Sequence, residues 1–141
     1  MKLAKIITQV PQGSKNPPPV YGQNEESEEE VELSIVCGEQ RQSDKGKKTL
    51  VLDLDETLVH SSFQVVENCD LILPVEIDDS LCEVFVMKRP GVDQFLAETA
   101  KWYELIIYTA SLKKYADPLL DWLDPKGLIS YRLFREDCTH Y

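Results

Sequence analysis

Residues 50–59 read LVLDLDETLV, an apolar run that ends in two aspartates and a threonine. The run predicts a buried strand from Leu50 to Leu54, with Asp53 and Asp55 at its carboxyl end. Ligands of open α/β sheets bind beyond that end of the strands. Side chains two residues apart on a strand point to the same side, and their origins lie about 6.6 Å apart. This gap suits a phosphoryl group and one hard divalent cation, without which the two carboxylates would repel each other.

The two aspartates suit different steps of phosphoryl transfer. An aspartate is ionised at neutral pH, so Asp53 can attack phosphorus and form an acyl phosphate. Asp55 would protonate the leaving oxygen and later accept a proton from water, which requires surroundings that raise its pKa. Thr57 can hydrogen-bond locally and hold the turn that aims both acids. The alternative is a strand that simply ends in a solvated turn, but the apolar strand before the pair and Thr57 after it favour catalysis.

Several blocks of the sequence resemble one enzyme family. The stretch LVLDLDETLVHSSF (50–63) resembles the aspartate-nucleophile phosphatases of the haloacid dehalogenase superfamily, and within them the small phosphatases that act on the carboxy-terminal domain of RNA polymerase II. The likeness continues in the same order through PVEID (74–78), KRPGVDQFL (88–96), YTASLKKYADP (108–118) and RLFRE (132–136). The resemblance covers residues 49–141, and IITQV at 6–10 is similar to the start of the same phosphatases.

This resemblance implies a protein serine/threonine phosphatase that depends on Mg²⁺ and removes phosphate from phosphoserine beside proline, as in the polymerase carboxy-terminal repeat. Asp53 would be the nucleophile and Asp55 the acid–base, and both would hold the metal ion. The hydroxyl of Thr109 and the backbone amides of Ala110 and Ser111 would bind the phosphate, helped by the dipole of the helix that follows. The alternative for this Thr-x-Ser is an ordinary helix cap. A nuclear location follows from the resemblance alone.

The resemblance also implies an apolar pocket for the substrate proline, built partly on a hairpin insertion. The matching positions are all apolar, namely Phe63, Val75, Ile77, Val84 and Leu112. Tyr115 and Arg135 match residues that contact the substrate peptide. Packing in the core is the alternative for the aliphatic residues. Phe63 is the most informative of these positions, because HSSF otherwise reads as an exposed loop.

Beyond the first strand, the pattern predicts strands and helices in alternation. Residues 71–77 and 83–87 read as two strands joined by the turn Asp78-Asp79-Ser80. A helix at 92–102, a strand at 104–109, a helix at 115–123 and a strand at 129–134 follow, with Pro118 tolerable only in the first turn of its helix. Such alternation implies right-handed crossovers and a parallel sheet. Together with the resemblance it predicts an α/β fold: an incomplete Rossmann-like haloacid dehalogenase fold with a β-hairpin insertion.

The first 48 residues differ in composition from the rest. They contain the run Pro17-Pro18-Pro19 and an acidic stretch at 25–32, and they cannot bury enough apolar area to offset chain entropy. We therefore expect a disordered acidic tail over 1–48 and the phosphatase-like part over 49–141. The acidic stretch reads as a solvated run, with an interaction tail as the alternative. The apolar residues among 31–36 predict a short strand or a docking segment.

Charge and cysteine content limit the function classes. The chain of 141 residues carries a formal net charge of −10, most of it after residue 48, which argues against direct nucleic-acid binding. The apolar runs are far shorter than the ~20 residues of a membrane span. The four cysteines lack the spacing of a zinc site, so we expect free thiols in a reducing, intracellular compartment.

The chain departs from the family at its carboxyl end. Family members continue for several tens of residues beyond the segment that matches 134–138. That part carries a lysine that pairs with the nucleophile and phosphate, and an aspartate that completes the magnesium site. We therefore expect a carboxy-terminally truncated domain with its first strand at a sheet edge and little activity by itself. The alternatives are a non-catalytic binding or regulatory short form and a truncated gene product that does not fold.

Overall fold

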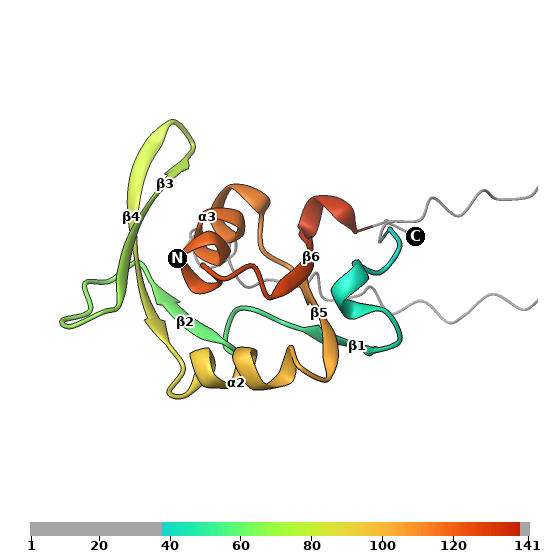
Figure 1. Ribbon diagram of the computed structural model, residues 1–141. Helices are drawn as coiled ribbons and strands as arrows, with labels where there is room; N and C mark the ends of the chain where they lie inside the picture. The colour runs from blue at the N-terminus through green and yellow to red at the C-terminus, as the bar shows by residue number, and fades with distance from the viewer. Residues whose placement is uncertain (1–37, 139–141) are drawn as a thin grey trace, which may run out of the picture.

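Two three-stranded sheets organise the computed structural model, which describes residues 38–138 (Figure 1). The first sheet has the order β1-β5-β6, with the strands Lys48–Leu52, Tyr103–Tyr108 and Ile129–Leu133, all paired in parallel. The second has the order β2-β4-β3, with the strands Val59–Ser62, Ser80–Lys88 and Leu71–Ile77, all paired antiparallel. The predicted α/β class with a parallel sheet is therefore confirmed.

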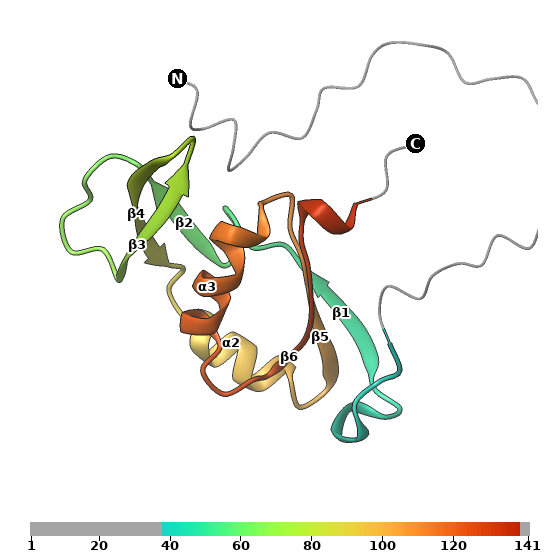
Figure 2. The same ribbon diagram turned by 90° about the horizontal axis from the view of Figure 1, so that it is seen from above.

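Both helices cover the same face of the parallel sheet (Figure 2). Helix α2 (Val92–Thr99) connects β1 to β5 through the insertion, and α3 (Lys113–Leu123) connects β5 to β6. Successive right-handed crossovers in one direction place their helices on one side of a sheet. The core lies between these layers, where Leu105 and Ile107 of β5 are fully buried and join Leu96, Leu119 and Leu120 from the helices.

The insertion between β1 and α2 is larger than the predicted hairpin. The predicted hairpin is present as β3 and β4, and its turn residues Asp78 and Asp79 have φ angles of 48° and 59°. Aspartate tolerates this left-handed conformation, which a two-residue hairpin turn requires. The interpretation of HSSF as an exposed loop is wrong, because β2 includes its first three residues and pairs with β4. This segment forms a strand because Val59 is buried and because β4, which pairs with β3 on one side, pairs with β2 on its other side.

Several predicted boundaries move by a few residues. The strand expected to reach Leu54 ends at Leu52, because Leu54 turns into a tight loop in which its carbonyl accepts the N–H groups of Leu58 and Val59 at 2.9 and 3.3 Å. Helix α2 ends at Thr99, three residues earlier than predicted. Helix α3 begins at Lys113, two residues earlier than predicted, so Pro118 lies past its first turn rather than within it. Pro118 is exposed there, and it has no N–H to donate to the carbonyl four residues before it.

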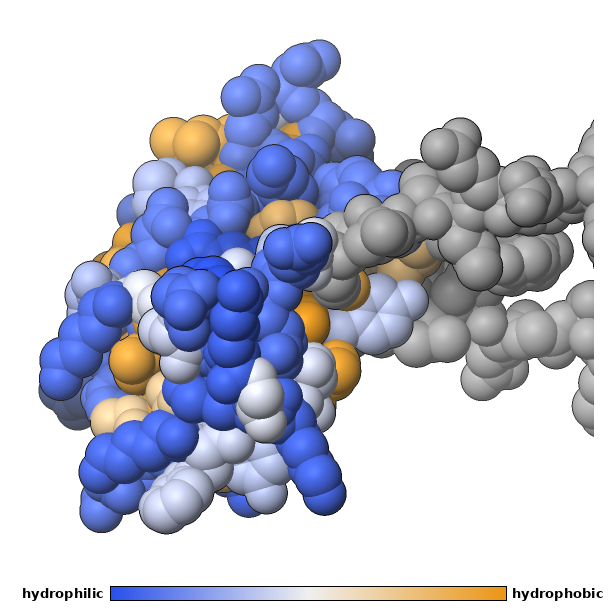
Figure 3. Space-filling view, turned by 45° about the vertical axis from the view of Figure 1, so that its right-hand side comes forward, coloured by the Kyte–Doolittle hydropathy of each residue, from blue (hydrophilic) through white to orange (hydrophobic). Residues whose placement is uncertain are grey.

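Strand β1 has a neighbour on only one side within residues 38–138, as its predicted edge position requires. The side chain of Val51 on this strand is 56% exposed. Figure 3 shows that hydrophilic residues predominate on the face it presents, with smaller apolar areas between them.

In the described part of the chain, neither helix has the length and apolar character needed to cross a membrane. Cys69, Cys82 and Cys138 are free thiols, as expected.

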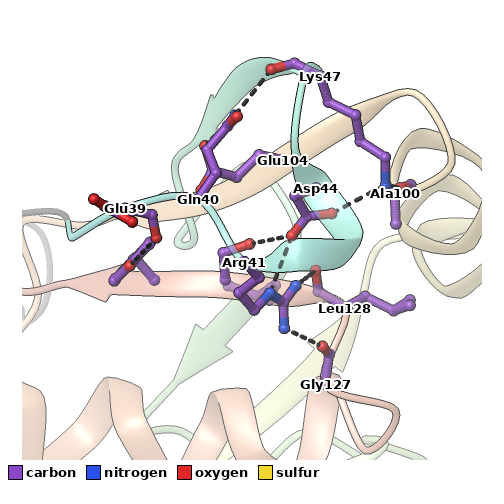
Figure 4. Close-up of polar contacts among 12 residues, drawn as sticks. Glu39, Gln40, Arg41, Asp44, Lys47, Ala100, Glu104, Gly127 and Leu128 are labelled. Carbon is purple, nitrogen blue, oxygen red and sulfur yellow. Dashed lines mark hydrogen bonds and ion pairs between the residues drawn. The ribbon is translucent and has the colours of Figure 1, made fainter.

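A buried carboxylate ties residues 38–47 to the parallel sheet (Figure 4). Asp44, in the short 3₁₀ helix η1 (Gln42–Asp44), accepts hydrogen bonds from Arg41 Nε, Lys47 Nζ and Ser130 Oγ, each at 3.0 Å. The Arg41 guanidinium also donates to the carbonyl oxygens of Gly127 and Leu128, both at 3.0 Å. This segment, which the sequence assigned to the tail, therefore packs against the start of β6. The rest of that tail, including 31–36, lies outside the described residues.

The same contacts lower the pKa of Asp44. Burial disfavours the charged carboxylate, but the hydrogen bonds from Lys47, Ser130 and Arg41 outweigh it and hold the pKa of Asp44 below its ordinary value. Because the pKa is lower in the folded than in the unfolded state, Asp44 stabilises the fold above about pH 4, the unfolded value. That stabilisation is lost as the pH falls through the folded pKa.

We expect Asp44→Asn to lower the free energy of unfolding at pH 7 by about 1–3 kcal/mol, because three donors lose a charged acceptor. Urea unfolding followed by circular dichroism measures this loss, which should shrink at pH 3. Asp79→Asn in the exposed hairpin turn removes the same charge and should change stability by less than about 0.5 kcal/mol. Equal unfolding midpoints for wild type and Asp44→Asn at pH 7 would show that the cluster does not stabilise the fold.

Candidate active site

Two neighbouring strands bring predicted site residues to one edge of the parallel sheet. Asp53 follows β1 and Thr109 follows β5, and the register of this pair places Leu52 opposite Ile107. The Thr109 N–H donates to the carbonyl of Leu133, the last residue of β6, at 2.9 Å, so all three strands end here. The carboxyl ends of parallel strands form the ligand-binding edge of such sheets. The strands before Asp53 and Thr109, β1 and β5, are therefore direct neighbours in the parallel sheet.

Asp53 is an exposed carboxylate at the start of a tight loop. The Thr57 hydroxyl donates to its Oδ2 at 3.4 Å, a long and therefore weak hydrogen bond. Glu56 adopts a φ of 59°, and the N–H of Thr57 donates to the Leu54 carbonyl at 3.3 Å. Arg89 holds the loop from outside by donating to the Thr57 carbonyl at 3.2 Å. The loop thus presents Asp53 to solvent on a supported backbone.

Asp55 lies two residues further on and is enclosed by hydroxyl groups. Its Oδ1 accepts from the Tyr115 hydroxyl at 2.8 Å, and its Oδ2 accepts from Ser111 Oγ at 2.6 Å. The Tyr115 hydroxyl in turn lies 2.6 Å from Ser61 Oγ on β2. Sequence reasoning missed Ser61, because nothing local in HSSF indicates a partner 54 residues away. Both carboxylate oxygens of Asp55 are therefore oriented by donors from distant segments.

The surroundings of Asp55 raise its pKa. Burial is the largest cause, and the negative charges of Asp53 and Glu56 act in the same direction. Hydrogen bonds from Ser111 and Tyr115 favour the charged form and oppose the rise without cancelling it. Burial and the charge of Asp55 also raise the pKa of Tyr115, so that Tyr115 stays a hydroxyl donor. Asp55 therefore has the raised pKa that a carboxyl needs in order to give and take a proton.

The loop after β5 uses its polar groups differently from the sequence expectation. Thr109 and Ser111 are both buried, and the Ser111 N–H donates to Thr109 Oγ1 at 3.1 Å. A threonine oxygen commonly accepts the amide two residues ahead in such a turn. Ser111 therefore uses its amide within the loop and its hydroxyl on Asp55, rather than presenting them to a phosphate. Ala110 is exposed beside them.

Arg135 lies next to this loop on the short 3₁₀ helix η2 (Arg135–Asp137). Its Nε donates to the Ala110 carbonyl at 2.6 Å, and its backbone N–H donates to the Ser111 carbonyl at 3.0 Å. The Glu136 carboxylate accepts the N–H of Lys113 at 3.1 Å. The structure thus places Arg135 beside the proposed phosphate loop, where it also braces the backbone.

The five residues proposed for the apolar pocket, together with Tyr115, which is proposed to contact the peptide, line one small cavity of about 10 Å³. They come from the insertion and from the start of α3, and they are Phe63, Val75, Ile77, Val84, Leu112 and Tyr115. Val75, Ile77 and Val84 are buried, whereas Phe63 and Leu112 are half-buried. Lys114 lines the same cavity. Phe63 and Tyr115 are separated in sequence by about half of the described chain, so only the fold brings the lining residues together.

Asp53 and Asp55 are the oxygen donors that suit a hard cation here. Within residues 38–138, no group of three or more His, Cys, Asp or Glu side chains is arranged to hold a metal ion. Mg²⁺ does not need such a group, because it keeps several waters and binds through one or two carboxylates and the phosphate of a substrate. The exposed carboxylate of Asp53 is open to such an ion, whereas both oxygens of the Asp55 carboxylate accept hydrogen bonds from Ser111 and Tyr115.

Comparisons with known proteins show the family to which this chain belongs. The pattern of the NLI interacting factor-like phosphatase family matches residues 48–141. The human CTD small phosphatase-like protein is 54% identical over 98 residues, which cover 70% of this chain and 36% of the relative. A probable C-terminal domain small phosphatase of Dictyostelium discoideum is 59% identical over 96 residues, which cover 68% of this chain and 31% of the relative.

A third relative is the human carboxy-terminal domain RNA polymerase II polypeptide A small phosphatase 1, 49% identical over 109 residues, or 77% of this chain and 42% of that protein. Among solved structures, the fission yeast RNA polymerase II CTD phosphatase Fcp1 bound to beryllium fluoride is similar with a TM-score of 0.58 and 25% identity. That match covers 67% of this chain and 31% of the other. The chain thus spans about a third of the length of the relatives it matches.

We expect Tyr115→Phe to raise the pKa of Asp55 further, because the substitution removes a donor that stabilises the charged carboxylate. Carbon NMR titration of the aspartate carboxyl groups measures the shift. Tyr131→Phe is the matched control, since its hydroxyl donates to the Glu39 carbonyl at 2.9 Å and touches no residue of the site. An unchanged or lower pKa of Asp55 in Tyr115→Phe would refute the role of this hydrogen bond.

Proposed function

Because the chain belongs to the NLI interacting factor-like phosphatase family, in the haloacid dehalogenase superfamily, we propose that Asp53 and Asp55 carry out the hydrolysis of phosphoserine beside proline. The observation that carries the proposal is the pairing of an exposed carboxylate with a partly buried one whose pKa is raised. An ionised nucleophile and a proton-holding acid two residues apart are what a phosphoryl transfer to aspartate requires.

The first step forms a phosphoenzyme. A carboxylate oxygen of Asp53 attacks phosphorus, the bond from phosphorus to the serine oxygen breaks, and Asp55 gives its proton to that oxygen. Mg²⁺, held by oxygens of Asp53 and Asp55, would offset the negative charge of the phosphate when bound. The Thr109 hydroxyl and the Ala110 amide would donate to phosphate oxygens. The Ser111 amide would join them by leaving Thr109, while the Ser111 hydroxyl would stay on Asp55.

The second step hydrolyses the acyl phosphate. Asp55, now ionised, accepts a proton from a water molecule as the water oxygen attacks phosphorus. The bond between phosphorus and Asp53 breaks, which releases orthophosphate and restores both carboxyl groups. Ser111 and Tyr115 hold Asp55 in one orientation for both proton transfers, because each donates to a different oxygen of its carboxylate. The Thr57 hydroxyl supports Asp53 between the steps.

We propose that the substrate is a phosphoserine peptide whose neighbouring proline enters the cavity lined by Phe63, Leu112 and Tyr115. The names of two relatives support this class, since a human relative and a solved yeast structure are phosphatases of the RNA polymerase II carboxy-terminal domain. Arg135 would contact the peptide from the loop side. The protein would then work in the nucleus, where that polymerase acts.

The test uses a protein that also contains the carboxy-terminal part of the family domain, with Mg²⁺ and a phosphoserine-proline peptide. In it we expect Asp53→Asn to abolish phosphoenzyme formation, because an amide is a poor nucleophile. Asp55→Asn should slow turnover by about a hundredfold or more, the usual scale of lost acid–base help. Rapid-quench labelling and kcat measure the two effects. Asp121→Asn, on the exposed side of α3, is the control and should keep wild-type rates.

Wild-type turnover by Asp53→Asn would show that another residue is the nucleophile. Peptide binding by the wild-type protein without any turnover would instead support the alternative of a non-catalytic binding form. The two results separate the chemistry of the Asp53–Asp55 loop from the binding role of the cavity.

Phe63→Ala should lower kcat/KM for the proline-containing peptide by about 1.5–3 kcal/mol in free energy, because a filled apolar contact is lost. A small aryl phosphate does not reach the cavity, so its hydrolysis should be nearly unchanged. Phe95→Ala is the matched control, because Phe95 is a partly exposed aromatic residue on α2 outside this cavity. Equal losses on both substrates would mean that Phe63 holds the fold rather than the peptide.

A further inference from the structure

Lys114 is the one charged side chain in the lining of the apolar cavity. The other lining residues are five apolar side chains and Tyr115, whose hydroxyl is committed to Asp55 and Ser61. Lys114 is exposed at the start of α3. None of the ion pairs within residues 38–138 includes it. Its ammonium group is thus available to a ligand at the edge of the cavity.

The position of Lys114 is unfavourable for the helix itself. The amino end of a helix carries partial positive charge and favours acidic residues, but the first turn of α3 has no acidic residue and begins with two lysines. The first of these, Lys113, has partners in η2 and beside it, since its backbone N–H binds Glu136 and its ammonium lies 5.8 Å from the centre of the Phe134 ring. Within residues 38–138, no ion pair and no contact with an aromatic ring involves the side chain of Lys114. In a chain with net charge −10, this makes the edge of the cavity a local positive site.

We propose that Lys114 selects substrates in which an anionic residue lies next to the apolar side chain that enters the cavity. The inference rests on the proposed function and adds a charge preference to it. Because the cavity of about 10 Å³ has room for little more than one water molecule, it would have to widen to take an apolar side chain, and the adjacent peptide residues would stay at its mouth. A glutamate or a second phosphorylated residue there would meet the ammonium of Lys114. An exposed ion pair of this kind gives a preference of roughly two- to fivefold, which salt screens.

The test compares kcat/KM for phosphoserine-proline peptides that differ only by glutamate or glutamine at each position flanking the proline. A third arm carries a second phosphoserine there and separates a carboxylate preference from a phosphate preference. In the full-length wild-type protein, glutamate should be favoured about two- to fivefold at one of these positions at low salt. The ratio should approach one at high salt, where charges are screened within a few ångströms.

Substitutions of Lys114 should change this ratio and leave other properties unchanged. Lys114→Ala should bring the ratio to about one, Lys114→Arg should keep it, and Lys114→Glu should favour glutamine. Lys45→Ala is the matched control, because Lys45 is an exposed lysine beside η1 and its loss changes the net charge equally. Turnover of a small aryl phosphate should be the same in all four variants, which shows that they are folded and catalytically intact.

The charge preference and the proposed catalysis can fail separately. An unchanged glutamate-to-glutamine ratio in Lys114→Ala, or a wild-type ratio of one at every position, overturns the role of Lys114 while catalysis stands. If the wild-type protein hydrolyses neither peptide nor aryl phosphate, the proposed function fails. Binding of the same peptides, measured by fluorescence anisotropy on Asp53→Asn protein, then gives the ratio without turnover, and loss of the preference in an added Lys114→Ala change still supports the inference.

Discussion

The parallel pairing of β1 with β5 is the constraint on which the rest of the structure depends. It sets Leu52 opposite Ile107, so Asp53, the next residue after Leu52, and Thr109, two residues after Ile107, leave the sheet at the same edge. Right-handed connections place both helices on one face, and this brings the start of α3 over that edge. At the other end of the same strands, the buried Asp44 ties the segment before β1 to the start of β6. The site is therefore positioned by the sheet and not by its own loops.

Tyr115 joins the two parts of the candidate site. Its hydroxyl donates to Asp55 at 2.8 Å and contacts Ser61 on β2, while its ring lines the apolar cavity. A ligand that fills the cavity must therefore touch the residue that orients the proposed acid–base. The insertion takes part through β2, which carries Ser61, and through the β3–β4 hairpin, which supplies Val75 and Val84. In the proposed function, peptide binding and proton transfer would thus be coupled through one buried side chain.

The electrostatics of the site follow from burial and not from the number of acids. Asp53 and Asp55 are two residues apart, yet one is exposed and the other is enclosed by the hydroxyl groups of Ser111 and Tyr115. The difference in desolvation gives Asp55 its raised pKa, and the neighbouring charge of Asp53 adds to it. Lys114 brings positive charge to the cavity edge of an otherwise acidic chain, where an anionic ligand would be drawn in.

The sequence by itself determined most of the helices and strands and the place of the Asp53–Asp55 pair after the first strand. The apolar run before Asp53, the turn at Asp78-Asp79 and the strand–helix alternation are local patterns, because they depend on periodicity and on backbone preferences of single residues. Tertiary structure alone decided that β2 pairs with β4, that the Ser111 hydroxyl binds Asp55, and that Asp44 anchors a segment read as tail. These contacts link residues far apart or depend on burial, and no local pattern encodes which distant group a polar side chain will meet.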